Sequence, residues 1–179
     1  MKKLLTLLIC VVALGAGALL GFWLSGGDPL AARSAPETTA TNAAEIVVYK
    51  SASCGCCGDW VTHMRDHGFT VTVHDSENMD RIKREAGVPR NLWSCHTAFA
   101  GDYVIEGHVP AAEVQRLLVE QPVAAGLAVP GMPLGSPGME VDDRRDAYAV
   151  VLFQEDGDVA AFAHYLGGER RDSRPGGTP

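Results

Sequence analysis

The chain has 179 residues, with 15 lysines and arginines against 22 aspartates and glutamates. This length accommodates one ordinary domain and a leader, but not two ordinary domains. Beyond residue 44 the imbalance is larger, with 12 basic and 20 acidic side chains. Because phosphate recognition requires clustered lysine and arginine, this composition excludes nucleic acid as an expected partner.

The N-terminus has the composition of an export signal. Lys2 and Lys3 precede an apolar run of 21 residues from Leu4 to Leu24. A basic start before such a run is typical of a signal peptide, and the run is also long enough to span a bilayer. Residues 1–25 are therefore predicted to be a signal peptide or an N-terminal membrane anchor. Both alternatives place the remaining chain outside the cytoplasm, with only this segment in the membrane.

Composition also predicts where the folded domain begins and ends. Residues 26–44 are rich in Ala, Thr, Gly, Ser and Pro without periodicity, which indicates a flexible linker. The domain is expected over 45–168. The charged, Pro- and Gly-rich residues 169–179 are predicted to be a disordered tail.

The expected elements follow one another in chain order. A strand at 46–49 leads into a cysteine-containing loop, a helix at 59–67, a strand at 69–74 and a helix at 78–86. Gly101-Asp102 predicts a hairpin between 97–99 and 103–105, and Pro110 opens a third helix. Residues 126–140 contain three prolines, four glycines and two methionines, and are expected to form an ordered loop without helix or strand. A second hairpin, 148–153 with 159–164, is expected to extend the sheet.

This order predicts an α/β fold that resembles the thioredoxin superfamily, with the Met/Pro/Gly loop and the second hairpin as a C-terminal addition. In that superfamily a thiol loop lies at a helix N-terminus, where the helix dipole stabilises thiolate. The stretch from Cys95-His96 to Gly107 resembles the glutaredoxin segment in which a cis-proline loop leads into the last hairpin. The resemblance implies that Cys95 and His96 lie against the cysteine loop, although His96 stands near the place where the superfamily has proline.

Four of the five cysteines lie outside the leader, at Cys54, Cys56, Cys57 and Cys95. Adjacent cysteines rarely bridge each other, and soft thiolates select copper(I), zinc or iron–sulfur clusters. Three thiolates within four residues crowd a single tetrahedral zinc, whereas sulfurs shared between several copper(I) ions relieve the crowding. Two alternatives stay open: a pair of disulfides, Cys54–Cys57 and Cys56–Cys95, or a redox-active Cys54–Cys57 pair.

Other side chains are candidate outer members of a metal site. His96 directly follows Cys95, and Met132 and Met139 offer soft thioethers in the Pro/Gly loop, where gap filling is the alternative. His63 and His67 have metal-pair spacing but are expected at a solvated helix boundary. The remaining histidines are expected at the surface: His74, His108 and His164.

Several motifs together resemble the CopG family of exported, thioredoxin-like proteins of bacterial copper resistance. They are the segments from Tyr49 to Trp60, Ser94 to Ala98, Glu106 to Pro110 and Val129 to Glu140. The resemblance implies a periplasmic protein with a thiolate-bridged multicopper site on Cys54, Cys56, Cys57 and Cys95. It also implies copper ions and other periplasmic copper-handling proteins as partners.

Three functions follow as hypotheses. The first is sequestration of copper(I), or interconversion of its oxidation states, in copper homeostasis. The second is a thiol–disulfide oxidoreductase with Cys54 as nucleophile and Cys57 as resolving thiol. The third is a disulfide-stapled structural module. The choice between a metal-binding protein and an enzyme stays open at this point.

Overall fold

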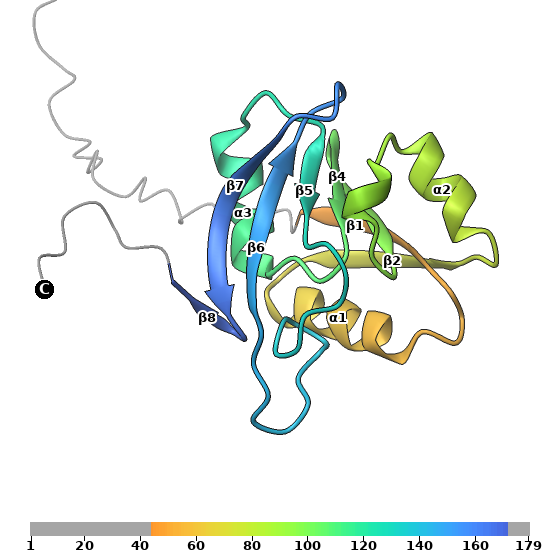
Figure 1. Ribbon diagram of the computed structural model, residues 1–179. Coiled ribbons are helices and arrows are strands. Elements are labelled where there is room, and N and C mark those ends of the chain that lie inside the picture. Colours follow the sequence, from red (N-terminus) through yellow and green to blue (C-terminus); the bar gives the residue numbers. More distant parts are fainter. Residues whose placement is uncertain (1–43, 172–179) are drawn as a thin grey trace, which may run out of the picture. The chain divides into compact units, whose positions relative to one another are not determined.

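The computed structural model describes residues 44–171 of the chain (Figure 1). The predicted α/β class is confirmed: this part holds three α-helices and one mixed sheet of eight strands in the order β2-β1-β3-β4-β5-β6-β7-β8. The predicted signal or anchor at 1–25, the linker as far as residue 43 and the tail from residue 172 lie outside the described residues. Among residues 44–171, no helix is long and apolar enough to cross a membrane.

The first half of the domain follows the predicted order of elements. Its elements are β1 (Glu45–Lys50), α1 (Gly55–Asp66), β2 (Thr70–Asp75), α2 (Met79–Glu85), a 3-10 turn (Arg90–Leu92), β3 (Thr97–Ala100), β4 (Tyr103–Glu106) and α3 (Ala111–Glu120). β1 pairs parallel with β2 and antiparallel with β3, and β3 and β4 form the predicted hairpin around Gly101-Asp102. The connection from β1 to β2 through α1 therefore places the cysteine motif at the end of β1, a strand with a neighbour on each side.

The second half adds four strands to the same sheet. β6 (Ala147–Phe153) and β7 (Val159–Leu166) form the predicted second hairpin, and β8 (Glu169–Arg170) pairs with the end of β7. The sheet thus continues two residues beyond the predicted end of the domain. The expectation that 126–140 contains no strand is wrong, because β5 (Gly126–Ala128) pairs with both β4 and β6. Three residues carry no alternating pattern, so only the two neighbouring strands make this segment a strand.

Helices cover both faces of the sheet. The larger core lies between the sheet and helices α1 and α3, and includes Trp60, Met64, Val114 and Leu117. The segment that follows α2 covers the opposite face with a smaller core around Val88, Leu92, Val104, Ala128 and Phe153. Alternation along β4 explains the division, because Val104 belongs to the smaller core and Ile105 to the larger one.

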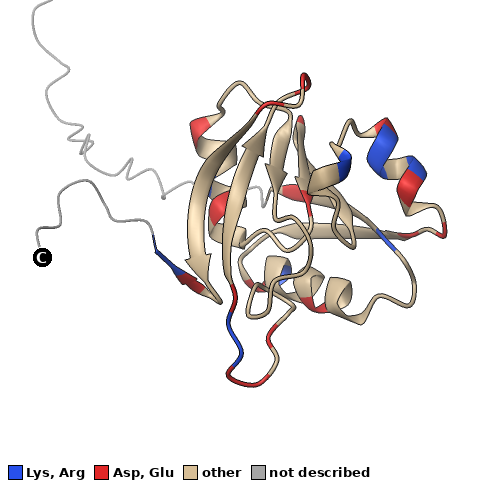
Figure 2. Cartoon of the chain, in the orientation of Figure 1, with Lys and Arg blue, Asp and Glu red and all other residues tan. Residues whose placement is uncertain are grey.

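Two arginines of α2 form ion pairs with acidic residues of the same helix. In Figure 2 helix α2 carries both the Lys and Arg colour and the Asp and Glu colour. Arg81 lies 2.9 Å from Glu85, and Arg84 lies 3.9 Å from Asp80, one helical turn apart in each case.

Candidate metal centre

The first helix begins four residues earlier than the sequence predicts, and this changes the setting of the cysteines. Cys54 is the N-cap of α1, and Cys56 and Cys57 lie in its first turn. Glycines at 55 and 58 conceal this turn in the sequence because glycine is a poor helix former. The motif therefore presents its sulfurs at the positive end of a helix, where negative charge on sulfur is favoured.

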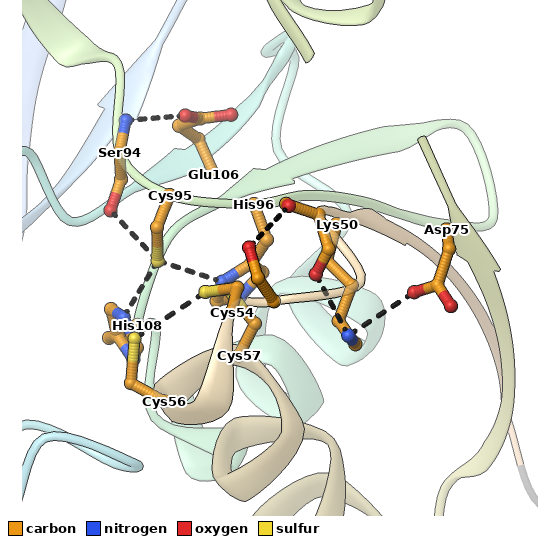
Figure 3. Close-up of a disulfide and its surroundings, with 12 residues drawn as sticks. Lys50, Cys54, Cys56, Cys57, Asp75, Ser94, Cys95, His96, Glu106 and His108 are labelled. Atoms are coloured by element: carbon orange, nitrogen blue, oxygen red, sulfur yellow. Dashed lines mark hydrogen bonds and ion pairs between the residues drawn. A yellow bond between two sulfur atoms is a disulfide. The ribbon is translucent and has the colours of Figure 1, made fainter. Parts of the chain in front are cut away.

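Cys54 and Cys57 form a disulfide, and Cys56 and Cys95 are free (Figure 3). The Cys56 Sγ lies 3.6 Å from the Cys54 Sγ. One of the two bridges that the disulfide alternative requires is thus present, and the Cys56–Cys95 bridge is absent. Cys57 is fully buried, whereas Cys54, Cys56 and Cys95 are half-buried.

The structure brings Cys95 to the cysteine motif. It lies just before β3, the neighbour of β1, and the sulfurs of Cys54, Cys56, Cys57 and Cys95 are all within 4.8 Å of one another. This is the placement that the glutaredoxin resemblance implies. Once the Cys54–Cys57 disulfide is reduced, four thiolates at such separations are a donor set that soft metal ions select. Their role as ligands stays a prediction.

His108 is a member of this cluster that the sequence analysis missed. The expectation that it lies at the surface is wrong: its side chain is fully buried, and its Nε2 lies 3.0 Å from the Cys95 Sγ. Its Nδ1 donates a hydrogen bond of 2.8 Å to the Pro137 carbonyl oxygen. The register of the predicted hairpin could have identified His108 as a neighbour of Cys95. Pairing of Thr97 with Glu106 sets Cys95 opposite His108.

His96 is also fully buried beside Cys95. Its Nδ1 lies 3.3 Å from the Cys95 Sγ, and its ring packs 4.4 Å from the Trp60 ring and 5.1 Å from the His108 ring, between centroids. Its Nε2 has no hydrogen-bond partner within the described part of the chain. Cys95, His96 and His108 thus form a second group whose donor atoms lie within 4.8 Å of one another.

Burial sets the protonation of these groups. It raises the pKa of the Cys95 thiol to about 12, and the neighbouring Cys56 sulfur adds to the rise. Burial also lowers the pKa of His96 and of His108, so both imidazoles are neutral, which is the form that binds metal. Without metal, the Cys95 thiol therefore carries its proton, and each imidazole keeps one unprotonated ring nitrogen.

A buried ion pair that the sequence analysis did not identify supports the Cys95 segment. Lys83 of α2 lies 2.6 Å from the Glu106 carboxylate, and both side chains are almost completely buried. The same carboxylate accepts hydrogen bonds from the Ser94 N–H at 2.6 Å and the Thr97 hydroxyl at 2.7 Å. Burial raises the pKa of Glu106, and the Lys83 ammonium opposes that rise. The residues on either side of Cys95-His96 are thereby fixed to one carboxylate.

The part of the Met/Pro/Gly loop that follows β5, residues 129–140, is called the methionine loop below. Its backbone contacts the first turn of α1, next to the cysteines. A Cβ on Gly138, which has φ +81°, would lie 2.6 Å from the Cys56 carbonyl oxygen, so the loop approaches α1 as closely as glycine permits. Met139 follows Gly138 and is half-buried, whereas the Met132 side chain is 53% exposed. The Ser94 hydroxyl donates to the Gly131 carbonyl oxygen, next to Met132.

The remaining histidines do not join the cluster. His63 Nε2 accepts a hydrogen bond of 3.1 Å from the Ala111 N–H, and His67 Nδ1 contacts the His63 carbonyl oxygen. His63 therefore has a structural partner, in agreement with the predicted boundary pair. His74 and His164 are exposed, as expected.

Together the fold and the cluster define a mixed α/β domain with a cysteine and histidine centre suited to a soft metal ion. The family described as "Protein of unknown function, DUF411" matches residues 92–139. Two solved structures, forms 1 and 2 of copper resistance protein CopG, are each 46% identical in sequence with a TM-score of 0.66. The form 2 match covers 69% of this chain and 98% of that one, and the form 1 match covers 70% and 99%. The chain belongs to the CopG family of copper resistance proteins, and no curated protein matches it.

Proposed function

We propose that this protein is an extracytoplasmic copper(I)-binding protein of copper homeostasis. Its thiolates at Cys54, Cys56, Cys57 and Cys95 would hold several copper(I) ions in a shared cluster. The observation that carries the proposal is the convergence of four sulfurs within 4.8 Å from two separate segments of the chain. The 46% identity to copper resistance protein CopG supports copper over other soft metals.

The donors present fit copper(I). Thiolate sulfur is the ligand type that this ion prefers, and His96 Nδ1, which lies 3.3 Å from the Cys95 Sγ, offers a further donor beside the sulfurs. Bound copper would contribute a one-electron redox couple. Cys54 and Cys57 share a disulfide in this structure, so two electrons and two protons from a dithiol reductant are required before all four sulfurs are available.

Anaerobic titration of the reduced full chain with copper(I), followed by metal analysis, tests this function. We expect several copper ions per chain, held against a competing copper(I) chelator and lost in Cys56→Ser and Cys95→Ser. Thr62→Ser, a hydroxyl change on the exposed face of α1, is the matched control and should bind as the wild type does. Wild-type protein that retains no copper(I) would contradict the proposal.

The second candidate is a thiol–disulfide oxidoreductase that uses Cys54 and Cys57. One observation favours it: a disulfide joins the N-cap of α1 to the first turn of that helix. In this function Cys54 thiolate would attack a substrate disulfide, and Cys57 would then release the reduced substrate. Efficient turnover of a model disulfide that survives Cys95→Ser, without retained metal, would favour this activity over copper binding.

We also propose that β1 to α3 form a thioredoxin-like unit, extended by β5 to β8. The strand order β2-β1-β3-β4, with β1 parallel to β2 and antiparallel to β3, supports this topology.

We also propose that the protein is periplasmic, because residues 1–25 are predicted to be a signal peptide or a membrane anchor. Fusion of a reporter that is active only after export, at the C-terminus of the full chain, tests the location. Mass analysis of the N-terminus distinguishes cleavage from anchoring.

A further inference from the structure

Two adjoining cavities form one groove at an end of the sheet. Their volumes are about 380 Å³ and about 450 Å³, and they share the wall residues Ala124, Ala125 and Glu155. We propose that this groove, called the acidic groove below, docks a basic, amphipathic polypeptide segment of a partner protein. The inference is independent of copper binding, because no residue that lines the groove belongs to the candidate metal centre.

The acidic groove lies at the far end of the sheet from the cysteines. Asp102 belongs to the turn that joins β3 to β4, whereas Cys95 and His108 flank the open end of the same hairpin. Glu155 belongs to the turn between β6 and β7, and the last residue of β6 pairs with the first residue of β5. A partner docked in the groove therefore leaves the cysteine cluster accessible.

Hydrogen bonds hold the walls of the groove in place. The Ala125 N–H donates to the Phe153 carbonyl oxygen at 2.9 Å, and the Ala125 carbonyl oxygen accepts from the Val104 N–H at 3.0 Å. The side-chain amide of Gln154 donates to the Val123 carbonyl oxygen at 2.8 Å. The segment between α3 and β5 is thereby fixed to its neighbours on both sides. A preformed groove costs little ordering when a partner binds.

The charges of the rim select a cationic partner. Among the described residues, four carboxylates and no lysine or arginine line the groove; they are Glu85, Asp102, Glu155 and Asp156. Arg81 pairs with Glu85 at 2.9 Å, and the other three carboxylates form no ion pair within the described part of the chain. Figure 2 shows the Asp and Glu colour on the turn between β6 and β7. Such a rim attracts lysine and arginine and repels anionic lipid and nucleic acid.

The floor of the groove selects apolar side chains. Val104 and three alanines form it, and Val123 at its border is 92% exposed. A single exposed valine is ordinary on a protein surface, but this one continues the apolar floor. An apolar centre inside a charged rim is the usual anatomy of a protein interface. Two adjoining cavities also offer places for successive side chains of one polypeptide, which favours a segment over a compact ligand.

Binding of a fluorescein-labelled synthetic peptide of alternating lysine and leucine to the full chain tests the inference. Fluorescence anisotropy at about 0.15 M salt should show saturable binding. The double variant Asp102→Lys with Glu155→Lys should weaken the affinity at least roughly tenfold, because attraction at the rim becomes repulsion. The matched control, Glu77→Lys with Asp143→Lys, makes the same change in net charge at exposed positions outside the groove. It should change the affinity less than about threefold.

A second pair of variants tests the apolar floor. Val123→Ser should weaken binding about threefold, because the peptide then covers less apolar surface. Val159→Ser, at a 44% exposed position outside the groove, should bind as the wild type does. The substituted side chains are all exposed, so each variant should keep the circular dichroism and the copper(I) binding of the wild type. Failure of the groove and failure of the copper site are therefore distinguishable.

Four results would overturn the inference. They are no saturable binding of the peptide, equal loss of affinity in the two charge-reversed variants, an unchanged affinity in Val123→Ser, and self-association through the groove. Equal loss in the two charge-reversed variants would assign binding to the net charge of the domain. Sedimentation of the full chain measures self-association, and its loss in Asp102→Lys with Glu155→Lys would make a second copy the occupant.

Discussion

The buried carboxylate of Glu106 accepts a hydrogen bond of 2.6 Å from the N–H of Ser94, the residue directly before Cys95. Thr97, two residues after Cys95, donates its hydroxyl to the same carboxylate, and Lys83 neutralises it from α2. A charged group at the end of β4 thus fixes both ends of the segment that delivers Cys95 and His96. The geometry of the candidate metal centre depends on this support.

Glu106→Gln should destabilise the protein strongly because it leaves the Lys83 ammonium buried without its counter-ion. Loss of one partner of a buried pair costs about 3–5 kcal/mol. Urea denaturation of the metal-free protein measures this change in the free energy of unfolding.

Two further variants serve as controls for that change. The double variant Lys83→Met with Glu106→Gln removes both charges and should recover at least about 2 kcal/mol relative to the single variant. Glu85→Gln breaks the exposed pair with Arg81 and should change the free energy of unfolding by less than about 1 kcal/mol. A double variant no more stable than Glu106→Gln would show that the charge of Lys83 is not the cause.

Gly138→Ala should displace the methionine loop from α1. The new Cβ would meet the Cys56 carbonyl oxygen at 2.6 Å and the Trp60 nitrogen at 2.7 Å, both of which are backbone atoms. We expect a loss of about 2–4 kcal/mol in unfolding free energy, and weaker copper binding because Pro137 withdraws from His108. Gly131 has a similar φ of +70° but open space around its Cβ position, so Gly131→Ala reports the backbone strain alone. Equal effects at the two glycines would rule out a steric cause.

Met139→Leu should weaken retention of copper(I) by the reduced protein, whereas Met132→Leu should not. Met139 adjoins the glycine that packs on α1 at Cys56, and Met132 is 53% exposed. Leucine preserves the volume of methionine, so the comparison isolates the thioether sulfur. Competition with a copper(I) chelator measures retention. Identical competition curves for wild type and Met139→Leu would assign this methionine to packing.

Protonation of His63 should lower the free energy of unfolding of the metal-free protein as the pH decreases from about 6.5 to about 4. Burial, with a further contribution from His67, lowers the pKa of His63 to about 4, although Asp66 opposes the shift. In this window the unfolded chain binds a proton that the native protein excludes, so the contribution of His63 is complete above the window and lost as pH falls through it. Protonation would also remove the acceptor of the Ala111 N–H at the start of α3.

Urea denaturation at about pH 7.5 and about pH 5 measures this effect. His63→Gln keeps an acceptor for Ala111 but does not titrate, so its stability should change less between the two conditions. His74→Gln, on an exposed position of β2, should behave as the wild type does. A pH dependence that is unchanged in His63→Gln would assign the effect to other groups.

Local patterns in the sequence determined most of the elements and the four cysteines. Alternating or helical periodicity, together with glycine and proline at element ends, predicted the three helices and both hairpins. The dense thiol motif at Cys54, Cys56 and Cys57 indicated a soft metal because residue type and spacing are local properties. The start of α1 is an exception, since glycines at 55 and 58 conceal a first helical turn.

Only the tertiary structure decided the composition of the centre. Strand β5 exists because β4 and β6 flank it, and the burial of Lys83 depends on Glu106 across the fold. His108 has no local signal that separates it from a surface histidine. It becomes a neighbour of Cys95 through the register of the hairpin, and Pro137 orients it from a loop that only the fold brings near. Periodicity records which face a residue occupies, whereas contacts between distant segments depend on how the elements pair.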